Sequence, residues 1–80
     1  MPRTSRAPVT TRELAVMQRI DEARRDIGMS QEALASAVGV SQGQVSKILA
    51  GLRPASLSET LKMLEAVGLT LSDVADELGI

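Results

Sequence analysis

The residues of this sequence best suited to chemistry are hydrogen-bonding side chains and one lysine that follow Ser41. On a helical wheel that starts after Ser41, the apolar residues Val45, Ile48 and Leu49 cover one side. The opposite side carries Gln42, Gly43, Ser46 and Lys47, with Gln44 on its flank. An apolar back and a polar front at the start of a helix are typical of a helix that reads bases in the major groove of DNA.

Two short helices joined by a tight turn are predicted to position this polar front. Ser30 is a good N-cap for a first helix over residues 31–38, and Gly39 can end that helix in a left-handed conformation without a Cβ penalty. Ser41 caps the second helix, which closes at Gly51. The side chains expected to face inward from the first helix and the turn are Leu34, Ala35, Val38 and Val40.

A longer helix is predicted before this pair. Thr10 and Glu13 have the spacing of a capping box, in which each side chain accepts a hydrogen bond from the other residue's backbone N–H. The helix is expected to run to about Ile27, before Gly28. Its apolar stripe consists of Val16, Ile20, Ala23 and Ile27.

A fourth helix follows a connection that contains Pro54, which forbids simple continuation of the helix before it. Ser56 and Glu59 form a second capping box, and Gly68 is expected to end the helix. Its predicted apolar stripe is Leu57, Leu61, Leu64 and Val67, with Met63 at the border.

The end of the chain is predicted to hold a short extended link over residues 69–71 and a last helix over residues 73–78, capped by Ser72. One face of that helix carries Val74, Ala75 and Leu78. Five helices and no strand-like alternation predict an all-α, compact five-helix domain over residues 10–80. Residues 1–9, with two prolines and two arginines, are expected to form a flexible basic arm.

The composition excludes several classes of function. The chain has no Cys, which excludes disulfides and thiolate metal sites and fits a reducing cytosol. It also lacks His, Tyr, Trp and Phe, and it shows neither a glycine-rich phosphate loop nor metal-ligand spacing, so we expect no enzyme and no cofactor. No apolar run approaches the roughly 18 to 20 residues that cross a bilayer, so a soluble, cytoplasmic protein without membrane association is expected.

The net charge of −1 hides a polarised distribution. Residues 1–12 contain three arginines and no acid, and the stretch between Glu32 and Glu59 contains Lys47 and Arg53 but no acid. Residues 63–80 contain four acidic residues and no basic one. A phosphate-facing end and an acidic far end would produce this asymmetry, and chance in a short chain is the alternative.

The arm over residues 1–9 has two interpretations. Arg3 and Arg6 could place it along or into a DNA groove, where positive charge contacts phosphates. An ordinary solubilising terminus would have the same composition. Both interpretations stay open at the level of sequence.

The stretch over residues 31–50 resembles the helix-turn-helix of the Cro and lambda-repressor family. The matching residues are Gln31, Ala35, Gly39, Val40, Ser41, Val45, Ile48 and Gly51. The later segment LSETLKMLEAVGLTLSDV is similar to the family's fourth helix and its link to the fifth, so the resemblance covers roughly residues 16–78. It implies a compact five-helix domain that binds operator DNA, usually as a two-fold dimer, and regulates transcription.

The resemblance also implies roles for single residues. Gln31 corresponds to a glutamine that meets a phosphate and braces the first glutamine of the next helix, here Gln42, which would offer its amide to an adenine edge. Arg53 is expected to clamp a phosphate. Gly43 departs from the family, in which related proteins often have a base-reading side chain there. The residues expected to contact DNA are Gln31, Ser41, Gln42, Gly43, Gln44, Ser46, Lys47 and Arg53, with Arg3 and Arg6 from the arm.

The acidic, apolar end of the chain is predicted to mediate homodimerisation, because it holds more apolar residues than the edge of so small a core needs. These residues are Leu69, Leu71, Val74, Leu78 and Ile80. The favoured function is a sequence-specific transcriptional regulator, a phage or prokaryotic repressor that occupies operator DNA at the nucleoid. The alternative is the antitoxin of a toxin–antitoxin pair, which would bind a toxin and autoregulate its operon. A family member without DNA activity is the third reading.

Overall fold

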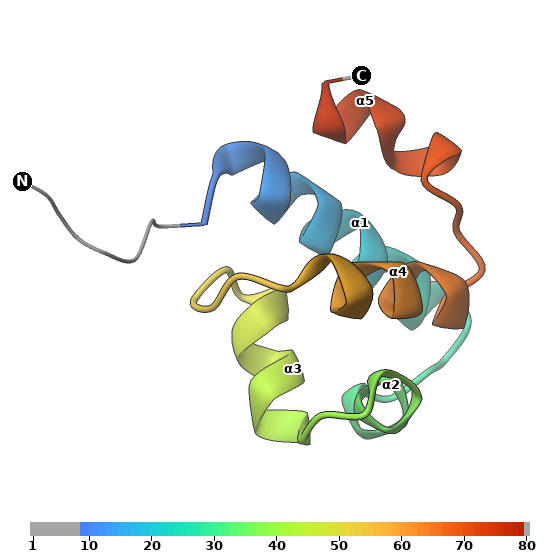
Figure 1. Cartoon of the computed structure of the whole chain (residues 1–80). Helices are drawn as coiled ribbons and strands as arrows, with labels where there is room; N and C mark the ends of the chain where they lie inside the picture. Colours follow the sequence, from blue (N-terminus) through green and yellow to red (C-terminus); the bar gives the residue numbers. More distant parts are fainter. Residues whose placement is uncertain (1–8, 80) are drawn as a thin grey trace, which may run out of the picture.

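A computed structural model describes residues 9–79 of the chain. In this range it contains helices and no strand, as the sequence predicts (Figure 1). Helices α2 and α3 lie on one side of α1, and α5 lies on the other (Figure 1). The elements are α1 Thr11–Asp26, α2 Gln31–Val38, α3 Gln42–Leu49, α4 Leu57–Ala66, a 3-10 helix η1 Ser72–Val74 and α5 Ala75–Leu78.

Both predicted capping boxes are confirmed. The Glu13 N–H donates to Thr10 Oγ1 at 3.0 Å, and the Thr10 N–H donates to Glu13 Oε1 at 2.7 Å. At the start of α4, the Glu59 N–H donates to Ser56 Oγ at 3.0 Å and the Ser56 N–H donates to Glu59 Oε1 at 2.9 Å. Each box satisfies backbone donors that have no partner within the helix, so both helix starts are defined locally.

The core is entirely aliphatic and lies where α1, α2, α3 and α4 meet. Ile20, Leu34, Ile48 and Met63 have no exposed surface, and within residues 9–79 no polar or charged residue is buried. The full set of buried residues is Val16, Met17, Ile20, Leu34, Ala35, Val38, Val45, Ile48, Leu49, Met63, Leu64, Val67 and Val74.

Two predicted apolar stripes are partly wrong. Ile27 is 57% exposed, because it follows the last residue of α1 and lies beyond the packed surface. On α4, Leu57 and Leu61 are 71% and 42% exposed, whereas Met63, predicted at the border, is fully buried. Helix α4 is therefore rotated from the predicted orientation, and its buried side is formed by Met63, Leu64 and Val67.

The C-terminal segment also differs from its prediction. Leu71 has helical rather than extended dihedrals, and the single predicted helix is a 3-10 turn followed by the short α5. Ser72 makes no capping hydrogen bond; instead the Asp73 N–H donates to Thr70 Oγ1 at 3.3 Å, and the Thr70 N–H donates to Asp73 Oδ2 at 2.8 Å. Arg19 of α1 attaches this segment, because its Nη1 donates to the Asp73 carbonyl at 3.2 Å and to Glu77 Oε1 at 3.3 Å.

Candidate nucleic-acid interface

The turn between α2 and α3 holds α3 firmly against the domain. Gly39 has φ +87° and donates its N–H to the Ala35 carbonyl at 2.8 Å, while Val40 packs against the core. The Ser41 hydroxyl caps α3 by accepting from the Gln44 N–H at 3.2 Å. Val45 is fully buried behind the helix. The orientation of α3 is therefore fixed by packing and capping in the free protein.

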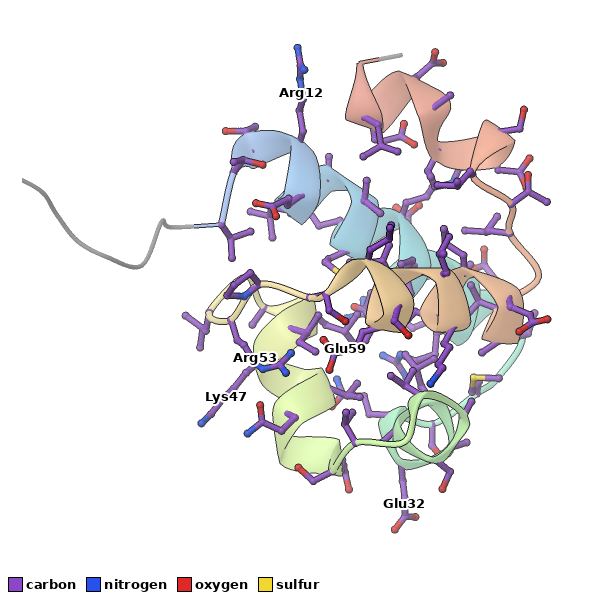
Figure 2. All side chains as sticks on the ribbon, in the orientation of Figure 1. Arg12, Glu32, Lys47, Arg53 and Glu59 are labelled. Carbon is purple, nitrogen blue, oxygen red and sulfur yellow. The ribbon has the colours of Figure 1, made fainter. Side chains whose placement is uncertain are left out.

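The predicted reading face of α3 points outward. Gln42, Gly43, Ser46 and Lys47 are exposed, and Gln44 is half-buried on the flank. Figure 2 shows Lys47 extending away from the helix on the side where Arg53 also lies. The polar front and apolar back of α3 thus agree with the wheel drawn from the sequence.

An open hollow of about 640 Å³ adjoins α3 and joins it to the connection before α4. It brings Gln44 and Lys47 of α3 next to Arg53, three of the residues predicted to contact DNA. The remaining lining residues are Leu52, Pro54, Ser56 and Glu59. The hollow therefore combines two cations with hydrogen-bonding groups at one side of the polar front.

Gln31 lies at the first position of α2 and is half-buried. The predicted brace between Gln31 and Gln42 is not formed in this structure: within residues 9–79, no hydrogen bond joins the two side chains. The two amides are thus not committed to each other in the free protein.

Arg53 is held by an acidic partner that the sequence interpretation missed. Its Nη1 donates to Glu59 Oε1 and its Nη2 donates to Glu59 Oε2, both at 3.1 Å (Figure 2). A third bond runs from Nη1 to the Pro54 carbonyl at 3.2 Å. The only sequence signal was a pair of opposite charges six residues apart across a proline turn.

This pairing shifts both titrations. The hydrogen bonds from Arg53, followed by the one from the Ser56 N–H, hold the pKa of Glu59 below its usual 4.5. The hydrogen bond to Glu59 raises the pKa of Arg53. Both groups therefore stay charged at neutral pH, and the ion pair is maintained.

The basic stretch at the start of the chain is described only in part. Arg3, Arg6 and Ile80 are outside the described residues, as is most of the predicted arm. Arg12, which belongs to the same basic stretch, lies next to Gly79 and away from α3 (Figure 2). Its charge therefore does not contribute to the polar front of α3.

The predicted dimer residues have unequal exposure. Leu71 is 45% exposed, and Leu69 and Leu78 are half-buried. Val74 is fully buried in the core cluster, so it offers no surface to a partner. Leu71 and Leu78 instead line an apolar groove of about 270 Å³ together with Leu57 of α4.

The described part of the chain shows no grouping of three or more His, Cys, Asp or Glu side chains that could hold a metal ion. Two of the three acidic residues of the C-terminal segment are engaged otherwise: Asp73 accepts from Thr70 and Glu77 pairs with Arg19. The same residues include no helix that is long and apolar enough to cross a bilayer.

Comparisons with known proteins agree with this arrangement. A helix-turn-helix family model matches residues 20–74. The restriction-modification controller protein C.AhdI from Aeromonas hydrophila is 31% identical, with a TM-score of 0.68 over 76% of this chain and 92% of that chain. A hypothetical transcription factor NHTF from Neisseria is 23% identical, with a TM-score of 0.69 over 99% of this chain and 94% of that one, which supports the fold. A search among curated proteins finds no match.

Proposed function

Because the chain belongs to the helix-turn-helix family of DNA-binding transcriptional regulators, we propose that it is a repressor of phage or prokaryotic type that reads operator DNA with α3. The observation that carries this proposal is the outward polar front of α3 on a fully buried apolar back. A helix fixed in this way presents its first turn to the major groove without reorganisation. Repression would follow from occupying a promoter.

The residues divide into base-reading and phosphate-contacting groups. In the proposal, Gln42 pairs with an adenine edge, and Gln44 and Ser46 add contacts to bases or to the backbone. Lys47 and Arg53 contact phosphates. Gln31, the first residue of α2, would meet another phosphate as α2 crosses the backbone. The arm would add Arg3 and Arg6.

A homodimer is proposed for the assembled repressor. Leu71 is exposed and lines the apolar groove together with Leu57 and Leu78. No residue of α3 lines this groove, although Arg53 does. A second copy bound there would leave both copies of α3 free for DNA. The half-sites would then lie about one helical turn apart, roughly 34 Å.

One observation favours the alternative function, the antitoxin of a toxin–antitoxin pair. Leu61 is exposed and does not line the groove proposed for the dimer, so apolar surface remains outside that contact. A protein partner could cover the remainder. Co-purification of a toxin of defined mass from the native host would favour this alternative, and a symmetric operator motif with no such partner would favour the repressor.

The proposal also places the protein in the cytoplasm, at the nucleoid, and assigns it no catalytic activity. The second point rests on the family, whose members are DNA-binding regulators, and on a composition without His, Cys and Tyr.

The proposal is tested by selecting from a randomised, labelled duplex library at two salt concentrations and sequencing the bound fraction. A two-fold symmetric motif is expected. Binding that depends on salt but enriches no motif would leave only non-specific electrostatic attraction. Absence of binding at both salt concentrations would contradict the proposal.

A further inference from the structure

The guanidinium of Arg53 uses only part of its donor set within the protein. Glu59 accepts from Nη1 and Nη2, and the Pro54 carbonyl accepts from Nη1. A guanidinium carries five N–H donors, so the Nε–H and the second Nη2–H remain. Neither has an acceptor among residues 9–79. These two donors share one edge of the planar group, with the spacing that fits two phosphate oxygens.

Glu59 is in turn fixed by α4. Its Oε1 also accepts from the Ser56 N–H at 2.9 Å, as part of the capping box. Its side chain is 16% exposed, whereas that of Arg53 is 34% exposed. Moving the Glu59 carboxylate away from Arg53 would therefore also break its hydrogen bond with the Ser56 N–H, which is one half of the capping box of α4. The position of the Arg53 cation is determined by a helix rather than by the connection that carries it.

The guanidinium of Arg53 is held beside α3, where a DNA backbone could reach it. Arg53 lines the same open hollow as Gln44 and Lys47, so it lies beside the flank of α3. Lys47 extends into solvent on that side (Figure 2). A DNA strand that follows α3 would pass both cations in succession. An arginine already held in its bound orientation loses less side-chain freedom on binding.

We propose that Glu59 is a positioning residue for DNA binding: it holds Arg53 through both Nη atoms so that the Nε–Nη2 edge faces a backbone phosphate beside α3. This inference rests on the proposed DNA-binding function. Under this proposal Glu59, an acidic residue at the edge of the interface, favours the binding of a polyanion. Glu59 itself makes no contact with DNA.

A positioning role for Glu59 predicts the direction in which DNA affinity changes when its charge is removed. An acidic side chain near DNA repels phosphates, so removing its charge should strengthen binding if charge alone mattered. The same gain is expected if Glu59 competes with phosphate for Arg53. Loss of affinity on neutralising Glu59 is expected if the residue orients Arg53, or if the substitution disturbs the structure of the interface.

The experiment compares Glu59→Gln with Glu65→Gln on a labelled duplex by fluorescence anisotropy. A glutamine at position 59 retains an oxygen for the Ser56 N–H, because capping boxes accept Gln as well as Glu. Glu65 is an exposed acid on the same helix with no ion pair in the described residues, so its variant removes an equal charge elsewhere. We expect Glu59→Gln to weaken binding on the order of fivefold, and Glu65→Gln not to weaken it.

Repeating the pair in an Arg53→Gln background separates positioning from a structural effect. There, Glu59→Gln should cause no further loss, since no guanidinium remains to be oriented. Unchanged or tighter binding by the single variant overturns the inference, and so does a loss that persists without Arg53. If the wild-type chain binds no duplex, the proposed function itself fails and the inference falls with it.

Discussion

Gly43 shows how one residue of α3 is adapted to its surroundings. It lies inside α3 without a positive φ, and an added Cβ would meet only Ser41 Oγ, at 3.9 Å. The free protein therefore does not require glycine here. Its absent side chain instead leaves the start of α3 bare on the face proposed to approach DNA.

Gly43→Ala is expected to raise the free energy of unfolding by about 0.5 kcal/mol, because alanine loses less conformational freedom in a helix. It should also weaken DNA binding if the backbone approaches the bases closely. Urea unfolding followed by circular dichroism measures the first effect. Gly51→Ala is the contrasting variant, since Gly51 has φ +78° and its Cβ would lie 2.9 Å from Leu14 Cδ1. A destabilised Gly43→Ala protein would contradict this account.

Arg53 is assigned a contact that carries no base information. Arg53→Gln should weaken binding to selected and random duplexes by similar factors. The slope of the logarithm of affinity against the logarithm of salt concentration should fall by about 0.9 for one lost phosphate contact. Titrations at several salt concentrations measure both quantities. A loss confined to the selected sequence would instead make Arg53 a base-reading residue.

The ion pair of Arg53 and Glu59 joins the connection after α3 to α4, and its contribution to the free energy of unfolding depends on pH with a defined sign. The pKa of Glu59 is lowered in the folded protein by Arg53 and Ser56. A carboxyl of this kind contributes stability above its ordinary pKa of 4.5, and this contribution is lost as the pH falls through the lower folded value.

We therefore expect Glu59→Gln to be less stable than the wild type by about 0.5 kcal/mol near neutral pH, a modest value because the ion pair is partly exposed. The difference should shrink in acid, well below pH 4.5. Urea unfolding of both proteins at the two pH values measures it. Asp73, whose pKa is lowered by hydrogen bonds from Thr70, is present in both proteins, so its effect cancels. A difference that is independent of pH would rule out the carboxylate charge as its source.

Structural features that depend only on residues close together in the chain, such as helix caps, were predictable from the sequence. The capping boxes at Thr10 and Ser56, and the left-handed Gly39, are confirmed because each depends on neighbours along the chain. The rotation of α4 was not predictable in this way. Leu57 and Met63 are both apolar, and packing of α4 against α2 decides which of them is buried.

Some features of the candidate site were likewise predictable from the sequence, and others were not. The outward front of α3 followed from the wheel, because its apolar back is unambiguous. The Arg53–Glu59 pair depends on how the chain turns through Pro54, a geometry that no local pattern specifies. The sequence predicts Ser72 as the cap of the C-terminal segment, whereas Thr70 forms the hydrogen bonds with Asp73; both residues have suitable side chains, and the choice depends on docking against α1.

Across the whole molecule, the proposed dimerisation surface includes no residue of α3, but it adjoins the proposed DNA-binding surface at Arg53, which lines both the hollow beside α3 and the apolar groove. Lys47 lies on α3 at one side of α1, and α5 is attached to the other side through the pair of Arg19 and Glu77 (Figure 1). The separation of Lys47 from α5 agrees with the charge polarity seen in the sequence, except for Arg12, which lies near the acidic end. Arg53 and Leu71, by contrast, both line the apolar groove. A second copy in the apolar groove would therefore meet the connection that carries Arg53, although no residue of α3 lines that groove.

Leu71→Glu is expected to shift the protein from dimer towards monomer, because it places a charge in the apolar contact. The control is Ile27→Glu, which changes an exposed apolar residue at the end of α1. Light scattering at high micromolar concentration, with and without DNA, reports the mass. A wild-type protein that stays monomeric under both conditions would remove the dimer from the account.

The central claim is that α3 reads DNA sequence, and it is tested most directly by repeating the library selection with Gln42→Ala. We expect the wild-type motif to be retained except at one base pair of each half-site, where the preference should relax at a cost of about 1 to 3 kcal/mol. A motif that is unchanged at every position would show that Gln42 reads no base. Equal losses on selected and random duplexes would contradict base recognition by this residue.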